Sequence, residues 1–108
     1  MSDYNERIAL TEGVFYILIS LKEPLHGYGI MQNVEKLSNG RVSLGPGTLY
    51  GALNSLLDKK WITAWGNTVN SRKKEYVITD TGIEVIKNEL SRLEELIQNG
   101  RIFLGGII

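Results

Sequence analysis

The sequence predicts a mainly α-helical fold that carries one small two-stranded antiparallel β-hairpin. Three stretches repeat apolar residues at helical spacing, and a fourth is apolar throughout. Two shorter stretches rich in β-branched and aromatic residues flank a turn that contains glycine and asparagine. A length of 108 residues, 43% of them hydrophobic, suits a single domain with one modest core.

Composition excludes several classes of protein. The chain contains no cysteine, so disulfides and thiolate-based metal or redox sites are excluded. The best apolar run, Val14 to Leu21, is far shorter than the ~18 residues that a membrane helix needs. Asp3 and Glu6 precede the first basic residue, Arg7, which is unlike a secretory signal. We therefore expect a soluble, cytoplasmic protein without a membrane partner.

Two helices are expected in the first forty residues. Thr11 is a suitable N-cap for the first helix, which must end by Glu23 because Pro24 disfavours helical geometry in its predecessor. This helix is apolar all round, which favours cover from a partner subunit. The second helix is expected from Gly27 to a stop at Asn39–Gly40.

A third helix is expected from Pro46 or Gly47 to about Lys60. Its two faces differ in chemistry. The apolar stripe consists of Leu49, Leu53, Leu56 and Leu57, and the opposite face shows Thr48, Tyr50, Gly51, Asn54 and Ser55. Because that opposite face holds small or hydrogen-bonding groups and no negative charge, it is suited to close contact with another molecule.

The hairpin is expected from strands at Trp61–Trp65 and Lys74–Ile78, with a tip between them that ends in positive charge. Two strands alone are only marginally stable, so the hairpin must lean on the helices. Trp61 and Trp65 share one face of the first strand. We expect both to pack in the core, with a ligand or subunit contact as the alternative.

The last helix is expected to start around Thr79–Gly82, where Thr81 and Glu84 have the spacing of a capping box. Its apolar residues follow at steps of 3, 4, 3 and 4, namely Ile83, Ile86, Leu90, Leu93 and Ile97. This heptad pattern predicts dimerisation, and packing against the chain's own core is the alternative. The tail from Phe103 to Ile108 is apolar and interrupted by glycine, so it either docks on a subunit or forms a ragged end.

The net charge is zero, but the charges are segregated along the chain. Residues 36–74 hold seven basic side chains and one acidic side chain, whereas residues 1–35 and 75–108 each carry a net charge of −3. A segment this basic indicates a polyanion partner, and a solvated basic surface is the alternative.

The order of elements predicts a winged helix-turn-helix in residues 1–78, continued in one domain by a dimerisation helix and tail in residues 79–108. In this arrangement the third helix enters the DNA major groove and the hairpin is the wing. Asn54 could pair with an adenine edge, and the Thr48 methyl could meet a thymine methyl. Tyr28 is expected to be a spacer between helices whose hydroxyl reaches a phosphate. The full set of predicted DNA contacts is Tyr28, Thr48, Tyr50, Asn54, Ser55, Arg72, Lys73 and Lys74, the basic wing residues neutralising phosphates.

Three segments carry a resemblance to a known family. They read LHGYGI at 25–30, LGPGTLYGAL at 44–53 and RKKEYVITDTG at 72–82. With these motifs the chain resembles the PadR family of bacterial transcriptional regulators, in its short form with one C-terminal helix. The resemblance implies a dimeric repressor that binds an inverted repeat and is released by a small, commonly aromatic effector. The chain departs from the family's pattern at Lys60 and Trp61, where Gly and Leu are usual, and its last helix lacks an aromatic residue before Phe103.

Other chemistry finds little support in the sequence. His26 is the single histidine, and we expect it to serve the start of the second helix rather than a metal. Neither a catalytic constellation nor a nucleotide-binding loop is present, so we expect no enzyme, no cofactor and no metal site. The alternative function is a winged-helix protein-interaction module that does not read DNA.

Overall fold

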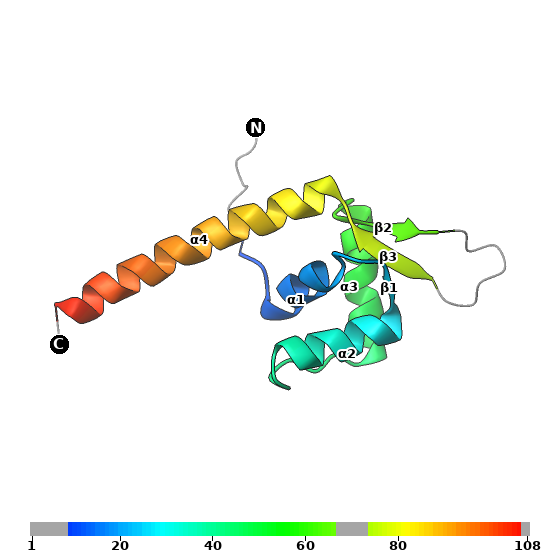
Figure 1. Cartoon of the computed structure of the whole chain (residues 1–108), viewed down its shortest axis with the longest axis horizontal. Coiled ribbons are helices and arrows are strands. Elements are labelled where there is room, and N and C mark those ends of the chain that lie inside the picture. The colour runs from blue at the N-terminus through cyan, green and yellow to red at the C-terminus, as the bar shows by residue number, and fades with distance from the viewer. Residues whose placement is uncertain (1–8, 67–73, 107–108) are drawn as a thin grey trace.

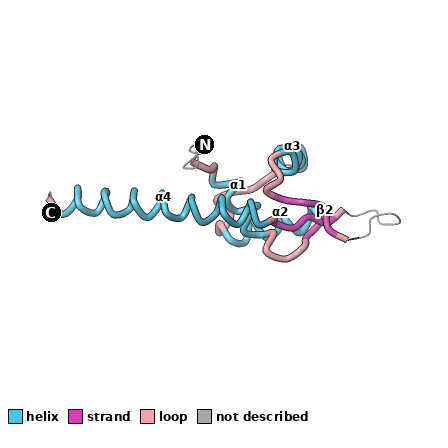
Figure 2. The backbone as a smooth tube through the Cα atoms, turned by 90° about the horizontal axis from the view of Figure 1, so that it is seen from above, coloured by secondary structure: helices cyan, strands magenta, loops and turns pink. Residues whose placement is uncertain are grey.

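The computed structural model describes residues 9–66 and 74–106. Within them, three helices and a small sheet form a body from which a long fourth helix projects (Figures 1 and 2). The elements are α1 (Glu12–Ser20), β1 (Leu25–His26), α2 (Gly27–Leu37), α3 (Pro46–Asp58), β2 (Ile62–Trp65), β3 (Glu75–Ile78) and α4 (Asp80–Gly105). The predicted fold class is confirmed.

The sheet has three strands in the order β1-β3-β2, so the prediction of a two-stranded hairpin was one strand short. Strand β3 pairs antiparallel with both neighbours, and Tyr76 lies opposite Leu25 on one side and Ala64 on the other. A strand of two residues has no alternating pattern, which is why the sequence gave no signal for β1. The added strand ties the wing to the start of α2.

The core is formed by apolar residues from α1, α2, α3 and the sheet. They are Ile17, Leu18, Leu21, Ile30, Val34, Leu49, Leu53, Leu56, Ile62 and Tyr76. A buried polar bridge crosses this core. Asn33 on α2 donates through Nδ2 to the Ser20 hydroxyl at 2.9 Å, and that hydroxyl donates to the Tyr16 carbonyl oxygen at 2.7 Å. Helices α1 and α2 are thus joined by side-chain hydrogen bonds as well as by apolar packing.

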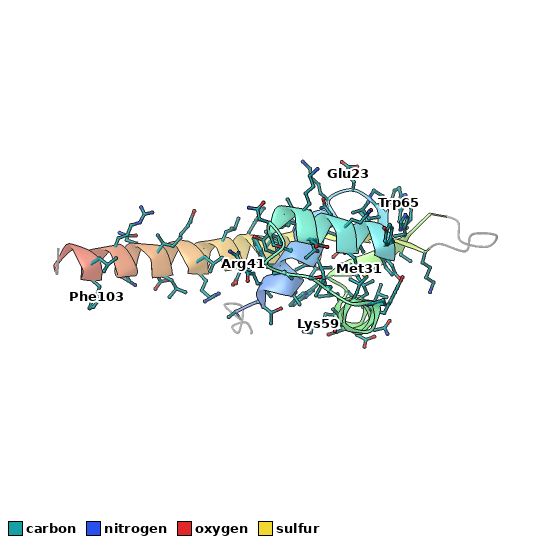
Figure 3. The ribbon with its side chains drawn as sticks, turned by 90° about the horizontal axis from the view of Figure 1, so that it is seen from below. Glu23, Met31, Arg41, Lys59, Trp65 and Phe103 are labelled. Atoms are coloured by element: carbon teal, nitrogen blue, oxygen red, sulfur yellow. The ribbon has the colours of Figure 1, made fainter. Side chains whose placement is uncertain are left out.

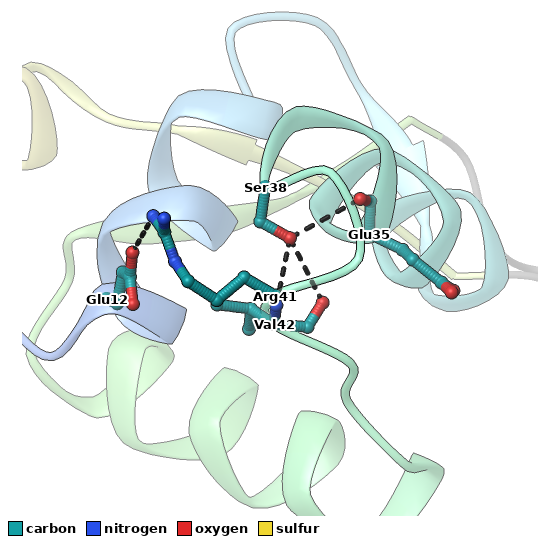
Figure 4. Close-up of polar contacts among 5 residues, drawn as sticks. All are labelled: Glu12, Glu35, Ser38, Arg41 and Val42. Carbon is teal, nitrogen blue, oxygen red and sulfur yellow. Dashed lines mark hydrogen bonds and ion pairs between the residues drawn. The ribbon is translucent and has the colours of Figure 1, made fainter.

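The connector after α2 is fixed by local hydrogen bonds and one ion pair (Figure 4). Asn39 and Gly40 have φ values of 54° and 80°, and the Gly40 N–H donates to the Glu35 carbonyl oxygen at 2.8 Å, which closes the helix. The Ser38 hydroxyl accepts from the Val42 N–H at 2.9 Å. Arg41 then pairs with Glu12 at the start of α1. These contacts set the direction in which the chain enters α3.

Helix α3 ends at Asp58, two residues before the predicted end at Lys60. Lys60 has a φ of 63°, in the left-handed region that favours glycine. The Trp61 N–H donates to the Leu56 carbonyl oxygen and the Lys60 N–H to that of Leu57, both at 3.0 Å. This is a Schellman C-cap with lysine at the position usually held by glycine.

The start of α4 differs from the predicted capping box. Its N-cap is Thr79 rather than Thr81, and the Thr79 hydroxyl accepts from the Gly82 N–H at 3.1 Å. Gly82 is required here, because a Cβ at this position would overlap the Trp61 carbonyl oxygen. Helix α4 is therefore seated directly on the turn that ends α3.

Helix α4 contacts α1 and β3 with its first half only. Glu89 is 4% exposed, and its carboxylate accepts two hydrogen bonds from Arg92 at 2.8 Å and one from the Leu10 N–H at 3.2 Å. The tail was predicted to dock or fray, but Phe103 to Gly105 continue the helix. Residues 107–108 lie outside the described part of the chain.

Candidate nucleic-acid interface

Helix α3 presents a broad exposed surface away from its buried leucines. Because successive helical residues turn by about 100°, the polar side chains form two flanks. Tyr50 and Asn54 lie on one flank, and Thr48 and Ser55 lie on the other; all four are exposed. The predicted polar face is therefore real but wide, and a strip of backbone separates its two edges.

Glycine occupies the centre of that surface. Gly47 and Gly51 lie between the two flanks, and a Cβ built at either position has no atom within 4 Å. Their φ angles are not positive. A helical glycine costs about 1 kcal/mol relative to alanine, and neither packing nor backbone geometry requires these two. The surface is thus open to close approach by another molecule at a cost to the helix itself.

Tyr50 has a packing role that the sequence did not reveal. Its ring covers Gly27, the first residue of α2, where a Cβ would overlap the Tyr50 hydroxyl. Tyr50 is nevertheless 45% exposed. Burial, and to a smaller extent the nearby Tyr50, raise the pKa of Tyr76 on β3. Tyr50 therefore links α3 to α2 and the wing while keeping an edge in solvent.

The first turn of α2 lies beside this tyrosine. His26 is its N-cap and accepts from the Gly29 N–H at 3.3 Å through Nδ1, which confirms the predicted helix-start role. Tyr28 is 62% exposed, so it does not act as the predicted spacer between helices. Its exposure leaves the predicted phosphate contact open.

Basic residues lie at two places around α3. Lys59 and Lys60 are exposed at its C-terminal end, and the Lys59 Nζ lies 4.8 Å from the centre of the Trp61 ring. Lys74 is exposed at the start of the wing's return strand, whereas Arg72 and Lys73 lie outside the described residues. Arg41 is held by Glu12 at α1, away from Lys59 (Figure 3). The basic segment of the sequence is therefore divided in space.

The two tryptophans do not share one environment, contrary to the prediction. Trp61 precedes β2 and is half-buried against the core. Trp65 is 52% exposed and lies opposite Glu75 in the register of the sheet. Since neighbouring strand residues alternate, Trp65 lies on the sheet face opposite buried Tyr76. Figure 3 places Trp65 and Lys59 on different sides of the body.

The heptad residues of α4 divide into two groups. Ile83, Leu90 and Ile97 are 42%, 46% and 53% exposed. Ile86 and Leu93 are half-buried, and Ile86 packs against the core. Both sequence interpretations thus describe part of the helix, because one side of the stripe contacts the body and the other side faces solvent. Dimerisation through this stripe stays a prediction.

A helical body with a β-wing, an exposed helix without acidic residues along most of its length, and a long C-terminal helix define the winged helix-turn-helix class of DNA-binding regulators. The transcriptional regulator PadR-like family model matches residues 14–88. The chain therefore belongs to the PadR-like family of transcriptional regulators. Membership of a family of regulators agrees with the expectation that the protein is not an enzyme.

Comparison with individual proteins gives the same fold. A PadR family transcription regulator from Clostridium difficile superposes with a TM-score of 0.67 and 23% identity over 86% of this chain and 97% of its own. BpsR of Bordetella bronchiseptica, whose DNA binding is regulated by 6-hydroxynicotinic acid, superposes with a TM-score of 0.64 and 16% identity over 83% of this chain and 64% of its own.

One sequence relative is closer in identity but much longer. An uncharacterized 37.1 kDa protein in transposon TN4556 of Streptomyces fradiae is 36% identical over 80 residues. The match covers 74% of this chain, and the chain spans about a fifth, 21%, of that protein's length. Among the described residues, no helix combines the length and the apolar character needed to cross a bilayer.

Proposed function

We propose that the protein is a cytoplasmic homodimeric repressor that binds an inverted-repeat operator and is released by a small aromatic effector. Residues 1–78 bind DNA, and residues 79–108 hold the two copies together. The observation that carries this proposal is the open surface of α3, where Gly47 and Gly51 have no neighbour within 4 Å. A helix that enters the major groove needs such a surface, because side chains without function would keep it away from the base edges.

The two flanks of α3 have different tasks in this proposal. Asn54 is exposed and has the amide that pairs with adenine, and Thr48 offers its methyl group to thymine. Ser55 borders a groove between α3 and the residues ahead of α1, so its contact lies at the edge of the interface. Tyr28 and Tyr50 project from adjoining helices and donate to phosphates on either side of the groove.

The wing and the end of α3 supply the attraction that does not depend on sequence. Lys74 is exposed at the wing, and Arg72 and Lys73 precede it in the chain. Lys59 and Lys60 add two exposed charges at the C-terminal end of α3. Each lysine or arginine on a phosphate releases bound counterions, so the affinity falls steeply with added salt.

The effector binds beside the joint between α1 and α4 in this proposal. A groove there is lined by Phe15 and Tyr16 on α1 and by Glu89, Arg92 and Leu93 on α4. The aromatic side chains can stack on a planar molecule, and the absence of an aromatic residue early in α4 is met by α1 instead. A ligand at this joint can alter how α4 is seated on the body and hence the spacing of two DNA-binding units.

Fluorescence anisotropy against a duplex from upstream of the protein's own gene tests the proposal. We expect saturable binding at low salt that weakens steeply as salt is raised, and tighter binding than to a scrambled duplex of equal length. An absence of duplex binding at low salt by a folded protein would contradict the proposal and favour the protein-interaction alternative.

A further inference from the structure

We infer that α4 pairs antiparallel with α4 of a second copy, in a register set by a row of alternating charges along one edge of the helix. This inference rests on the proposed homodimer, and it adds the orientation of the two helices and the residues that meet. It is carried by three properties of α4, namely which side the body covers, where its apolar surface continues, and how its charges are spaced.

The body covers only one side of the first half of α4. Gly82 and Glu89, seven residues apart, are buried there. The adjoining side carries Ile83, Leu90, Ile97 and Leu104 at steps of seven residues, and these are 42%, 46%, 53% and 50% exposed. An apolar row of this length on a helix surface needs a covering partner, because isolated apolar side chains are common on surfaces but continuous rows are not.

The second half of α4 extends beyond the body, as Figure 1 shows. Every described residue from Glu94 onward is exposed, including Leu96 and Phe103 at 54% and 66%. These two lie seven and fourteen residues after Glu89, so they continue the side that the body covers in the first half. In an antiparallel pair, the second half of one helix lies beside the first half of the other, where the partner's α1 can cover them. A parallel pair would leave both second halves without a body beside them.

The edge next to the exposed apolar row alternates in charge. It carries Asp80, Lys87, Glu94 and Arg101 at steps of seven residues, and all four are exposed. Lys87 also contacts Glu84 at 3.3 Å, a surface pair that water screens. Because seven residues are close to two helical turns, these charges form one line along α4, about 40° from the apolar row.

Antiparallel helices bring this edge against the same edge of the partner. One register places Asp80 opposite the partner's Arg101 and Lys87 opposite the partner's Glu94, and the two-fold axis repeats both pairs. A slip of one heptad in one direction would place Lys87 opposite the partner's Arg101, and a slip in the other would place Asp80 opposite the partner's Glu94. Both slips bring like charges together, so the row selects one register by attraction and by repulsion.

The same register gives a consistent apolar seam. It places Ile86 opposite the partner's Ile97, Leu90 opposite the partner's Leu93, and Ile83 opposite the partner's Gly100. A Cβ at Gly100 has no atom within 4 Å in the single chain, so the fold itself does not require glycine there. Ile83 and Ile86 also line a groove with Leu18 and Ile19 of α1. The second half of the partner's α4 fills this groove in the pair.

Cysteine cross-linking tests the orientation directly, because the chain contains no cysteine. The variants are Asp80→Cys, Arg101→Cys and the double variant, all at exposed positions, treated with a short thiol-to-thiol cross-linker. The two sites are about 31 Å apart along one helix, which prevents a link within one chain. We expect cross-linked dimer from the double variant and little from either single variant.

Each other outcome has a separate meaning. Efficient cross-linking of both single variants would show parallel helices and overturn the inference. A dimer by light scattering that yields no cross-link in the double variant would overturn the register. A monomer by light scattering of the unaltered protein would contradict the proposed homodimer itself.

Charge reversal tests the role of the alternating row. Lys87→Glu and Glu94→Lys should each weaken dimer association by about threefold to tenfold, and the double reversal should restore it to within about twofold. Asn88→Glu, which adds a charge on the other side of α4, is the matched control and should have a smaller effect. Equal association of all these variants, measured by analytical ultracentrifugation, would overturn the assignment.

Discussion

The hydroxyl of Thr79, the N-cap of α4, donates a hydrogen bond of 2.7 Å to the carbonyl oxygen of Lys60, the residue that closes α3. The Thr79 N–H also donates to the Trp61 carbonyl oxygen at 3.0 Å. One residue therefore joins the end of the proposed recognition helix to the start of the proposed dimerisation helix. Any change in how α4 is seated reaches α3 through this joint.

Replacing Thr79 tests the joint. Thr79→Val keeps the shape but removes the hydroxyl that caps α4 and bonds Lys60, so we expect a loss of about 1–2 kcal/mol in the free energy of unfolding. Thr79→Ser retains the hydroxyl and should lose much less. Urea denaturation followed by circular dichroism measures both, and equal stability of Thr79→Val and the unaltered protein would contradict the role.

Lys60 should be replaceable by glycine with a gain in stability. Its φ of 63° is strained for a residue with a Cβ, and glycine adopts it freely. We expect Lys60→Gly to raise the free energy of unfolding by up to about 1 kcal/mol and Lys60→Ala to give no such gain. The paired denaturation curves decide, and equal stability of the glycine and alanine variants would argue against backbone strain.

Gly51→Ala should separate stability from binding. The added methyl group meets open space and favours the helix, so we expect the free energy of unfolding to rise by about 0.5–1 kcal/mol. DNA affinity in anisotropy should fall, because the methyl group holds α3 away from the groove. Gly13→Ala on α1 is the matched control, since its Cβ would make only an ordinary 3.7 Å contact with Leu44. It should leave DNA affinity unchanged.

Asn54 and Lys73 should differ in the kind of binding they lose. Asn54→Ala should relax the choice of one base pair at a cost of about 1–3 kcal/mol. Lys73→Ala should weaken binding to every duplex and reduce the slope of affinity against salt by about one unit. Anisotropy titrations with matched and mismatched duplexes at two salt concentrations distinguish the two effects. If neither substitution alters binding, the docking geometry is wrong.

The ion pair at the base of α4 makes stability depend on pH. Hydrogen bonds from Arg92 lower the pKa of Glu89, with a further contribution from the Leu10 N–H that outlasts the opposing effect of burial. A lowered folded-state pKa stabilises the fold above the ordinary glutamate pKa of about 4.3, and this stability is lost as the pH falls through the folded-state pKa. Glu89→Gln should flatten the loss of stability below that pH. Urea denaturation from pH 3 to pH 7 would show it, and parallel profiles would contradict the role of Glu89.

Much of the local structure followed from the sequence because it depends on near neighbours. Thr11 caps α1, Pro46 opens α3, and Asn39–Gly40 end α2, each as the residue types predict. The core leucines of α3 were identified because a period of 3.6 residues is visible in one dimension. The exposed polar residues of α3 followed from the same period.

Features that depend on contacts between distant residues could not be predicted in this way. Strand β1 exists because Leu25 and His26 find β3 about fifty residues later. Tyr50 covers Gly27 and Thr79 caps α4 because the tertiary fold brings separate motifs together. Ile86 and Leu93 belong to the same sequence stripe as Leu90, but only the position of the body decides which of them it covers.

The amino-acid order alone determined the class of fold, the family resemblance and the chemical character of each surface, since these depend on composition and short-range periodicity. The tertiary structure decided which surfaces stay exposed and which side chains connect one helix to the next. The physical reason is that burial is a property of the assembled chain, whereas propensity and periodicity belong to each segment by itself.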